Sequence, residues 1–74
     1  MKTLAETIGE NIRAKRKAMG MNQAKLANKV GTYSQTIVSL WENGYYCPHL
    51  VTLCALADVF GCSVDELLGR CKDG

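Results

Sequence analysis

One stretch constrains the fold more than any other: residues 23–44, with the sequence QAKLANKVGTYSQTIVSLWENG. Apolar residues recur at helical spacing on both sides of a central glycine, with Leu26, Ala27 and Val30 before it and Val38 and Trp41 after it. Gly31 can adopt a positive φ at little cost, which a sharp corner between two helices needs. The stretch therefore predicts two short helices joined by a tight turn, the second ending at Gly44.

The outer face of the second helix carries small hydrogen-bonding side chains without charge, namely Ser34, Gln35, Thr36 and Ser39. A helix face that meets only solvent is ordinarily charged. Uncharged polar side chains instead suit close contact with hydrogen-bonding edges, such as those of the bases in the major groove of DNA. This face therefore favours a helix that recognises DNA.

The start of this helix has two interpretations. Either Thr32 is the N-cap, because Thr32 and Gln35 have capping-box spacing, or Ser34 is the N-cap and the turn is one residue longer. The two choices bury different pairs, Ile37 and Leu40 in the first case and Val38 and Trp41 in the second. We favour the second, because exposing Trp41 would forfeit the largest apolar anchor available. Tyr33 is then expected to pack over the corner.

Capping signals and glycines predict three further helices in the rest of the chain. The first begins at Thr3 with a capping box and ends at Gly20, the fourth can start at Pro48 and stops at Gly61, and the fifth opens at Ser63. The expected inward residues are Leu4, Ile8, Ile12 and Met19 in the first helix, Leu50, Leu53, Cys54, Ala57 and Phe60 in the fourth, and Val64, Leu67 and Leu68 in the fifth.

The chain has 74 residues, of which 47% are hydrophobic, enough for one domain with a modest core. No run approaches the roughly 20 apolar residues of a transmembrane helix, and the N-terminus lacks the apolar segment of a signal peptide. We expect a cytoplasmic, all-α domain of five short helices over residues 1–74, with its core at 4–69 and a frayed tail at 70–74.

The formal net charge of +2 hides an uneven distribution. Residues 1–31 hold seven Lys and Arg against two Glu, whereas residues 32–74 hold two basic residues against five acidic ones. This division indicates one face turned to a polyanion, although ordinary solubilising charge is an alternative explanation. Asn22 is a good N-cap for the helix that begins at Gln23, and the free N–H groups of that first turn form a natural phosphate site.

The four cysteines are Cys47, Cys54, Cys62 and Cys71, and their spacings contain no C-x-x-C pair. A structural zinc site therefore has little support, and in a reducing cytosol free thiols are expected. We predict no metal and no cofactor. Cys54 is expected in the core and Cys47 at the surface, beside His49.

Three segments carry a resemblance to a known family: IGENIRAKRKAMGMNQAKLA (Ile8–Ala27), SQTIVSLWENG (Ser34–Gly44) and LCALADVFGCSVDELL (Leu53–Leu68). In this order they resemble the phage repressor/Cro-type helix-turn-helix regulators, the XRE family. The resemblance implies a compact, lambda-repressor-like fold and a transcriptional regulator, a repressor, that binds operator sequences in double-stranded DNA. The helix after Ser34 would enter the major groove, and a homodimer would bind two half-sites about 34–36 Å apart.

The resemblance also implies roles for single residues. The expected base contacts are Ser34, Gln35, Thr36, Ser39 and Leu40, with Gln35 the best candidate to read an adenine. The expected phosphate contacts are Gln23, Asn43, Arg13, Lys17 and Tyr45. Arg16 and Glu42 would form an internal ion pair that ties the first helix to the end of the recognition helix.

The chain departs from the family pattern in three places. The turn after Gly31 is one residue longer than usual. Tyr45, Tyr46 and Cys47 stand where many relatives carry Lys or Arg, and Leu40 stands where a polar or basic residue is common. With fewer cations near the phosphates, we expect modest DNA affinity and a shallow dependence on salt.

Two other functions compete with DNA binding. A protein-interaction module, such as an antitoxin-like partner, would use Leu40, Tyr45 and Tyr46, and a redox or metal switch would use Cys47, His49 and another thiol. An enzyme is not expected, since no nucleophile and base stand at a recognisable spacing. The dimer surface is expected on the last helix and the tail, with Leu68 and Cys71.

Overall fold

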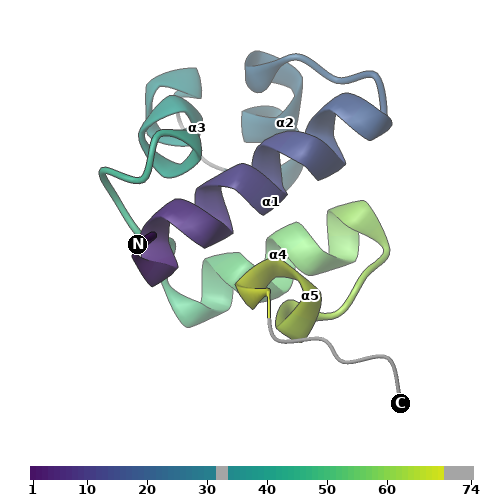
Figure 1. Ribbon diagram of the computed structural model, residues 1–74. Helices are drawn as coiled ribbons and strands as arrows, with labels where there is room; N and C mark the ends of the chain where they lie inside the picture. The colour runs from purple at the N-terminus through teal and green to yellow at the C-terminus, as the bar shows by residue number, and fades with distance from the viewer. Residues whose placement is uncertain (32–33, 70–74) are drawn as a thin grey trace.

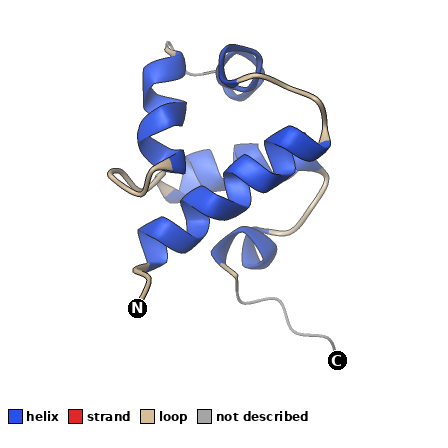
Figure 2. Cartoon of the chain, turned by 45° about the horizontal axis from the view of Figure 1, so that its top comes forward, coloured by secondary structure: helices blue, strands red, loops and turns tan. Residues whose placement is uncertain are grey.

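Five α-helices make up the computed structural model of the chain, which describes residues 1–31 and 34–69 (Figure 1). They are α1 (Leu4–Ala18), α2 (Gln23–Val30), α3 (Gln35–Glu42), α4 (Leu50–Phe60) and α5 (Val64–Leu68). The described residues contain no strand (Figure 2). Over those same residues, every helix is too short or too polar to cross a membrane. The predicted all-α, five-helix architecture is confirmed.

Four of the helices begin where a polar side chain caps the backbone, as the capping signals predicted. Thr3 and Glu6 form a reciprocal capping box on α1, and Asn22 accepts a hydrogen bond from the Lys25 N–H at 2.8 Å. Ser34 caps α3, and Ser63 caps α5. Each cap satisfies an N–H group that has no partner within its own helix.

The cap on α3 decides between the two interpretations of the turn. Ser34 accepts from the Thr36 N–H at 2.9 Å, so the longer turn is confirmed and the interpretation with Thr32 as N-cap is wrong. Thr32 and Tyr33 themselves, and with them the predicted packing of Tyr33, lie outside the described residues. Before the turn, Gly31 has φ +88°, the left-handed conformation that the corner was predicted to need.

The start of α4 differs from the prediction. The helix begins at Leu50, two residues after Pro48, and its N-cap His49 makes no side-chain capping bond. Pro48 is buried instead of opening the first turn. A proline is compatible with a first helical position but does not require it, since its fixed φ suits extended backbone equally well.

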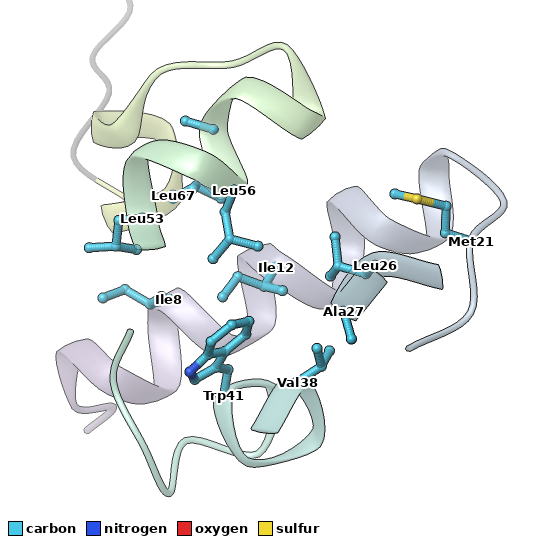
Figure 3. Close-up of a cluster of buried hydrophobic side chains, with 11 residues drawn as sticks. Ile8, Ile12, Met21, Leu26, Ala27, Val38, Trp41, Leu53, Leu56 and Leu67 are labelled. Atoms are coloured by element: carbon cyan, nitrogen blue, oxygen red, sulfur yellow. The ribbon is translucent and has the colours of Figure 1, made fainter. Parts of the chain in front are cut away.

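Helix α1 runs through the middle of the molecule, with α2 and α3 on one side and α4 and α5 on the other (Figure 1). The core between them consists of Ile8, Ile12, Met21, Leu26, Ala27, Val38, Trp41, Leu53, Leu56, Ala57 and Leu67 (Figure 3). Val64 and Leu68 pack against this core. Every helix thus contributes at least one buried side chain.

Four side chains predicted to face inward are exposed. Leu4 and Met19 lie at the two ends of α1, and Leu50 and Cys54 lie on the outer side of α4. Met21 and Leu56, which the spacing argument did not select, are buried in the core. The reason in α4 is that LVTLCALADVF is apolar on nearly every side, so its spacing permits more than one inward face and the neighbouring helices decide.

Helix α1 contacts α3 on one side and α5 on the other. Gly9 of α1 lies against the end of α3, where an added Cβ would stand 2.1 Å from the Trp41 carbonyl oxygen. At the other side, the Asn11 amide donates to the carbonyl oxygens of Glu66 and Leu67, at 3.3 and 2.9 Å. Lys15 Nζ lies 2.7 Å from Glu66 Oε2. These polar contacts join the first helix to the last.

Candidate nucleic-acid interface

Helix α3 has a buried face and an exposed face. Val38 and Trp41 anchor the buried face in the core, as the favoured interpretation of the turn predicted. The exposed positions coincide with the predicted base contacts: Ser34, Gln35 and Thr36 are exposed, Leu40 is 36% exposed and Ser39 is half-buried. Because the opposite face is packed, the exposed face is held in one orientation. An uncharged, hydrogen-bonding helix end is thus presented to a partner.

The C-terminal end of α3 is held by a buried carboxylate. The Glu42 side chain is fully buried, and its two oxygens accept from Arg16 Nε at 2.6 Å and from Arg16 Nη2 at 3.1 Å. A third guanidinium nitrogen donates to the Met21 carbonyl at 2.8 Å. Hydrogen bonding to Glu42 raises the pKa of Arg16. The structure thus contains the predicted ion pair, in the bidentate geometry that suits arginine.

Two residues predicted to bind phosphate also contact Glu42. Gln23 Nε2 donates to Glu42 Oε1 at 3.1 Å, and Arg13 Nε lies 3.5 Å from the same oxygen. These two contacts were not predicted. Arg13 and Arg16 are three residues apart on one face of α1, which is the one sequence signal that could have indicated a shared partner.

Both residues keep hydrogen-bonding capacity for a phosphate. The Arg13 side chain is about half exposed and, with five N–H donors in all, retains others beyond Nε. Gln23 uses one of its two amide hydrogens on Glu42 and has a second one left. The Glu42 carboxylate therefore orients Arg13 on α1 and Gln23 at the start of α2. Each of the two side chains still has hydrogen-bond donors left for a phosphate.

The remaining predicted phosphate contacts lie at exposed positions. Asn43 donates to the Ser39 carbonyl at 2.8 Å and to Ser39 Oγ at 3.3 Å, which places one predicted phosphate contact against one predicted base contact. Tyr45 follows in the loop, with its N–H bonded to the Leu40 carbonyl. Lys17 is exposed in the last turn of α1. Arg13, Gln23, Asn43 and Tyr45 thus lie near the C-terminal end of α3, and the predicted base contacts begin at its N-terminal end.

A pocket of about 240 Å³ opens beside α3. Its walls come from the end of α2, from Ile37 and Trp41, and from the segment with Tyr46, Pro48 and His49. Trp41 Nε1 is buried without a hydrogen-bond partner among the described residues. The pocket walls are mainly apolar.

Three of the four cysteines, Cys47, Cys54 and Cys62, lie in the described part of the chain, each as a free thiol. Cys47 is exposed as predicted, Cys54 is exposed where a core position was predicted, and Cys71 lies outside the described residues. Within residues 1–31 and 34–69, no three His, Cys, Asp or Glu side chains come together as a metal site. The Cys47 and His49 pair therefore has no third ligand in that part of the chain.

The thiols are expected to differ in reactivity. Partial burial raises the pKa of Cys62, so a smaller fraction of it is thiolate at neutral pH than of an exposed thiol. In a Cys71→Ser background, Ellman's reagent should modify Cys47 and Cys54 at least about tenfold faster than Cys62. The three rates should converge in denaturant, and equal rates in the folded protein would contradict the burial of Cys62.

Comparison with known proteins places this arrangement among DNA-binding regulators. The sequence profile of the Helix-turn-helix family matches residues 12–67. Repressor protein C2 of Salmonella phage P22 is 40% identical over 63 residues, and the CTXphi transcriptional repressor RstR of Vibrio cholerae is 36% identical over 63 residues. Each alignment covers 85% of this chain, but only 29% of C2 and 55% of RstR. The chain thus spans about a third and about half of these relatives.

Two crystal structures share the fold. The P22 c2 repressor in complex with a synthetic operator superposes with a TM-score of 0.80 at 39% identity, over 86% of this chain and 96% of that one. The restriction-modification controller protein C.AhdI of Aeromonas hydrophila superposes with a TM-score of 0.78 at 28% identity, over 85% and 94%. This chain therefore shares its fold with both proteins over most of its length.

Proposed function

The chain belongs to the helix-turn-helix family, and from that premise we propose that it is a transcriptional repressor that binds specific sequences in double-stranded DNA. The observation that carries this proposal is the exposed, uncharged polar face of α3, held in place by the burial of Val38 and Trp41. The similar P22 c2 repressor has been crystallised on a synthetic operator, which supports the same activity here.

In the proposed complex, the N-terminal half of α3 lies in the major groove. Gln35 is exposed in the first turn, where its amide can donate to and accept from one adenine, a contact worth about 1–3 kcal/mol of discrimination. Thr36 and Leu40 bring methyl groups to the same face and can touch thymine methyls. These contacts read sequence, whereas the phosphate contacts set position.

The phosphate contacts would hold α3 in register. Arg13 and Lys17 contribute cations from α1, and Gln23 contributes its free amide hydrogen together with the N–H groups at the start of α2. Asn43 and Tyr45 would bind from just beyond the C-terminal end of α3. Few of these groups are cations, so binding should weaken only moderately with salt. One copy would bind weakly, and a homodimer on two half-sites about 34–36 Å apart would bind in the cytoplasm with useful affinity.

Selecting bound sequences from a random duplex library, at two salt concentrations, tests this function. Recovery of a short two-fold-symmetric motif is expected, and its half-site spacing tests the docking geometry. Weak binding that disappears with salt and yields no motif would sink the proposal. It would favour the alternative of a protein-interaction module, for which the exposed Tyr45 and Tyr46 are the supporting observation.

Replacing Gln35 by alanine should relax the base preference at one position of each half-site while leaving the melting temperature nearly unchanged. The reason is that Gln35 is exposed on the face predicted to read bases, so its amide contributes to discrimination and not to packing. Repeating the selection on the variant measures this. Asn28→Ala, which removes an exposed amide from α2 outside the predicted contacts, is the control. A sharp fall in melting temperature would show that Gln35 is structural.

A further inference from the structure

Ser39 and Asn43 form a hydrogen-bonded pair where α3 ends. Asn43 Nδ2 lies 2.8 Å from the Ser39 carbonyl oxygen and 3.3 Å from Ser39 Oγ. Asn43 is the exposed C-cap of the helix, and Ser39, one turn earlier, is half-buried. A single amide thus contacts both the backbone and the hydroxyl of a residue that is predicted to contact a base.

The contact with the carbonyl determines which way the Asn43 amide faces. A carbonyl oxygen only accepts hydrogen bonds, so the amide atom against it is the nitrogen, which donates, and not the amide oxygen. The backbone N–H of Asn43 donates to the same carbonyl at 3.0 Å, so this oxygen accepts twice. The hydrogen-bond pattern therefore distinguishes the two ends of the amide, and the NH₂ group is the end that faces Ser39.

This orientation assigns a role to Ser39 Oγ. An amide nitrogen donates and does not accept, so Ser39 Oγ accepts from Asn43 and its own hydrogen points elsewhere. Within residues 1–31 and 34–69, the Ser39 hydroxyl makes no second hydrogen bond. Its hydrogen is therefore available to an atom of the DNA.

A hydroxyl that already accepts one hydrogen bond favours acceptors over donors on the DNA. If it meets an acceptor, such as a purine N7, guanine O6 or thymine O4, its hydrogen is used and one lone pair is left over. If it meets a donor, such as the amino group of cytosine or adenine, the oxygen accepts twice and its hydrogen has no acceptor. Leaving a desolvated donor unpaired costs more than leaving a spare lone pair. The hydrogen bond from Asn43 also polarises the hydroxyl, which makes it a better donor.

We propose that Asn43 is a positioning residue that makes Ser39 a hydrogen-bond donor, and that Ser39 reads an acceptor atom on a base edge of the operator. The inference rests on the proposed function and deepens it. The partner is a base and not a phosphate, because Ser39 lies one helical turn after Gln35 and Thr36, on the face with the predicted base contacts. A phosphate contact by Asn43 is compatible with this role, since one amide hydrogen can be shared between the two Ser39 oxygens, which leaves the other hydrogen for the phosphate.

The test removes single atoms from the duplex recovered by selection. Analogues that lack one acceptor, such as deazapurines without N7, and analogues that lack one amino group, such as purine in place of adenine, are placed at one position at a time. Fluorescence anisotropy measures the dissociation constants of the full wild-type chain and of Ser39→Ala on each duplex. Because both proteins meet the same DNA, any effect of an analogue on the duplex itself cancels in the ratio of the two constants.

Loss of one acceptor should weaken binding of the wild type about tenfold and change binding of Ser39→Ala hardly at all. Loss of an amino group should affect the two proteins equally at every position. The inference is overturned if the DNA group that depends on Ser39 is an amino group, or if no acceptor on the duplex depends on Ser39.

Replacing Asn43 separates its positioning role from a structural one. Asn43→Ala removes the donor to Ser39, and Asn43→Asp keeps the shape but offers the hydroxyl an acceptor, so both should reduce the tenfold dependence on that DNA acceptor to about threefold or less. Asn28→Ala, which removes an exposed amide from α2, should keep the full dependence. Circular dichroism checks that each variant is folded at the assay temperature. A full tenfold dependence in both Asn43 variants overturns the positioning role, since a purely structural loss lowers stability without changing which DNA atom is read.

This inference and the proposed function fail in different ways. If selection recovers a motif but no acceptor on it depends on Ser39, the protein reads DNA and the inference is wrong. If selection recovers no motif, the proposed function is refuted, and the inference is refuted with it.

Discussion

Replacing Gly9 by alanine is expected to lower the free energy of unfolding by about 3 kcal/mol or more, the upper end of what overpacking costs. The added Cβ would stand 2.1 Å from the Trp41 carbonyl oxygen and 2.9 Å from the Glu42 carbonyl oxygen. Both are backbone atoms at the end of α3, so no side chain can rotate away. Helix α1 would have to move off α3, which separates Ile8 and Ile12 from the core they share with Trp41.

Urea unfolding followed by Trp41 fluorescence measures the effect of Gly9→Ala. The control is Ala14→Gly, at an exposed position of the same helix, where the change in helix propensity alone costs about 1 kcal/mol. By propensity, alanine at position 9 should stabilise α1. A Gly9→Ala variant as stable as the wild type, or more stable, would therefore show that α1 and α3 do not approach so closely.

Removing the Glu42 carboxylate should lower the free energy of unfolding by as much as Gly9→Ala does, or by more. Glu42→Ala would leave the buried Arg16 guanidinium without its partner, a change that typically costs about 3–5 kcal/mol. Gln23 and Arg13 would lose the same acceptor. Since the ion pair joins α1 to the end of α3, the melting temperature of Glu42→Ala should fall strongly. Arg16→Ala should likewise lower the melting temperature, while changing the preferred DNA sequence little.

Two further variants make this measurement specific. Glu10→Ala removes the partner of Lys2 in an ion pair whose side chains are both more than half exposed, and it should change stability by less than about 1 kcal/mol. The double replacement of Arg16 by Met and Glu42 by Leu should be milder than Glu42→Ala, because no charge is left buried. If Glu42→Ala lowered stability no more than Glu10→Ala does, the buried ion pair would not be what holds α1 to the end of α3.

The parts of the fold that could be predicted from the sequence are those that local chemistry determines. Thr3, Asn22, Ser34 and Ser63 cap their helices because a side-chain oxygen and nearby N–H groups are all that a cap requires. The inward side of α3 was predictable as well, because only one of the two choices buries Trp41. Neither inference depended on distant parts of the chain.

The parts that could not be predicted depend on how helices meet. Leu50 and Cys54 were assigned to the core because α4 is apolar on two sides, and only the packed neighbours decide between them. Gly9 gave no local signal, since its role comes from the approach of α3 thirty-two residues later, at Trp41. The predicted DNA contacts remain predictions, and the structure adds that Gln23 and Arg13 share the carboxylate of Glu42.

The bonds from Asn11 and Lys15 to the end of α5 bear on how the protein is made. Their partners, Glu66 and Leu67, lie 51 to 56 residues further along the chain. Translation at about 5–20 residues per second delivers them roughly 3–10 s after α1 has been synthesised. Through that interval α1 has neither these acceptors nor the buried Leu67 beside it. A nascent or prematurely terminated chain that stops before α5 therefore lacks the contacts that hold α1 on the side facing away from α3.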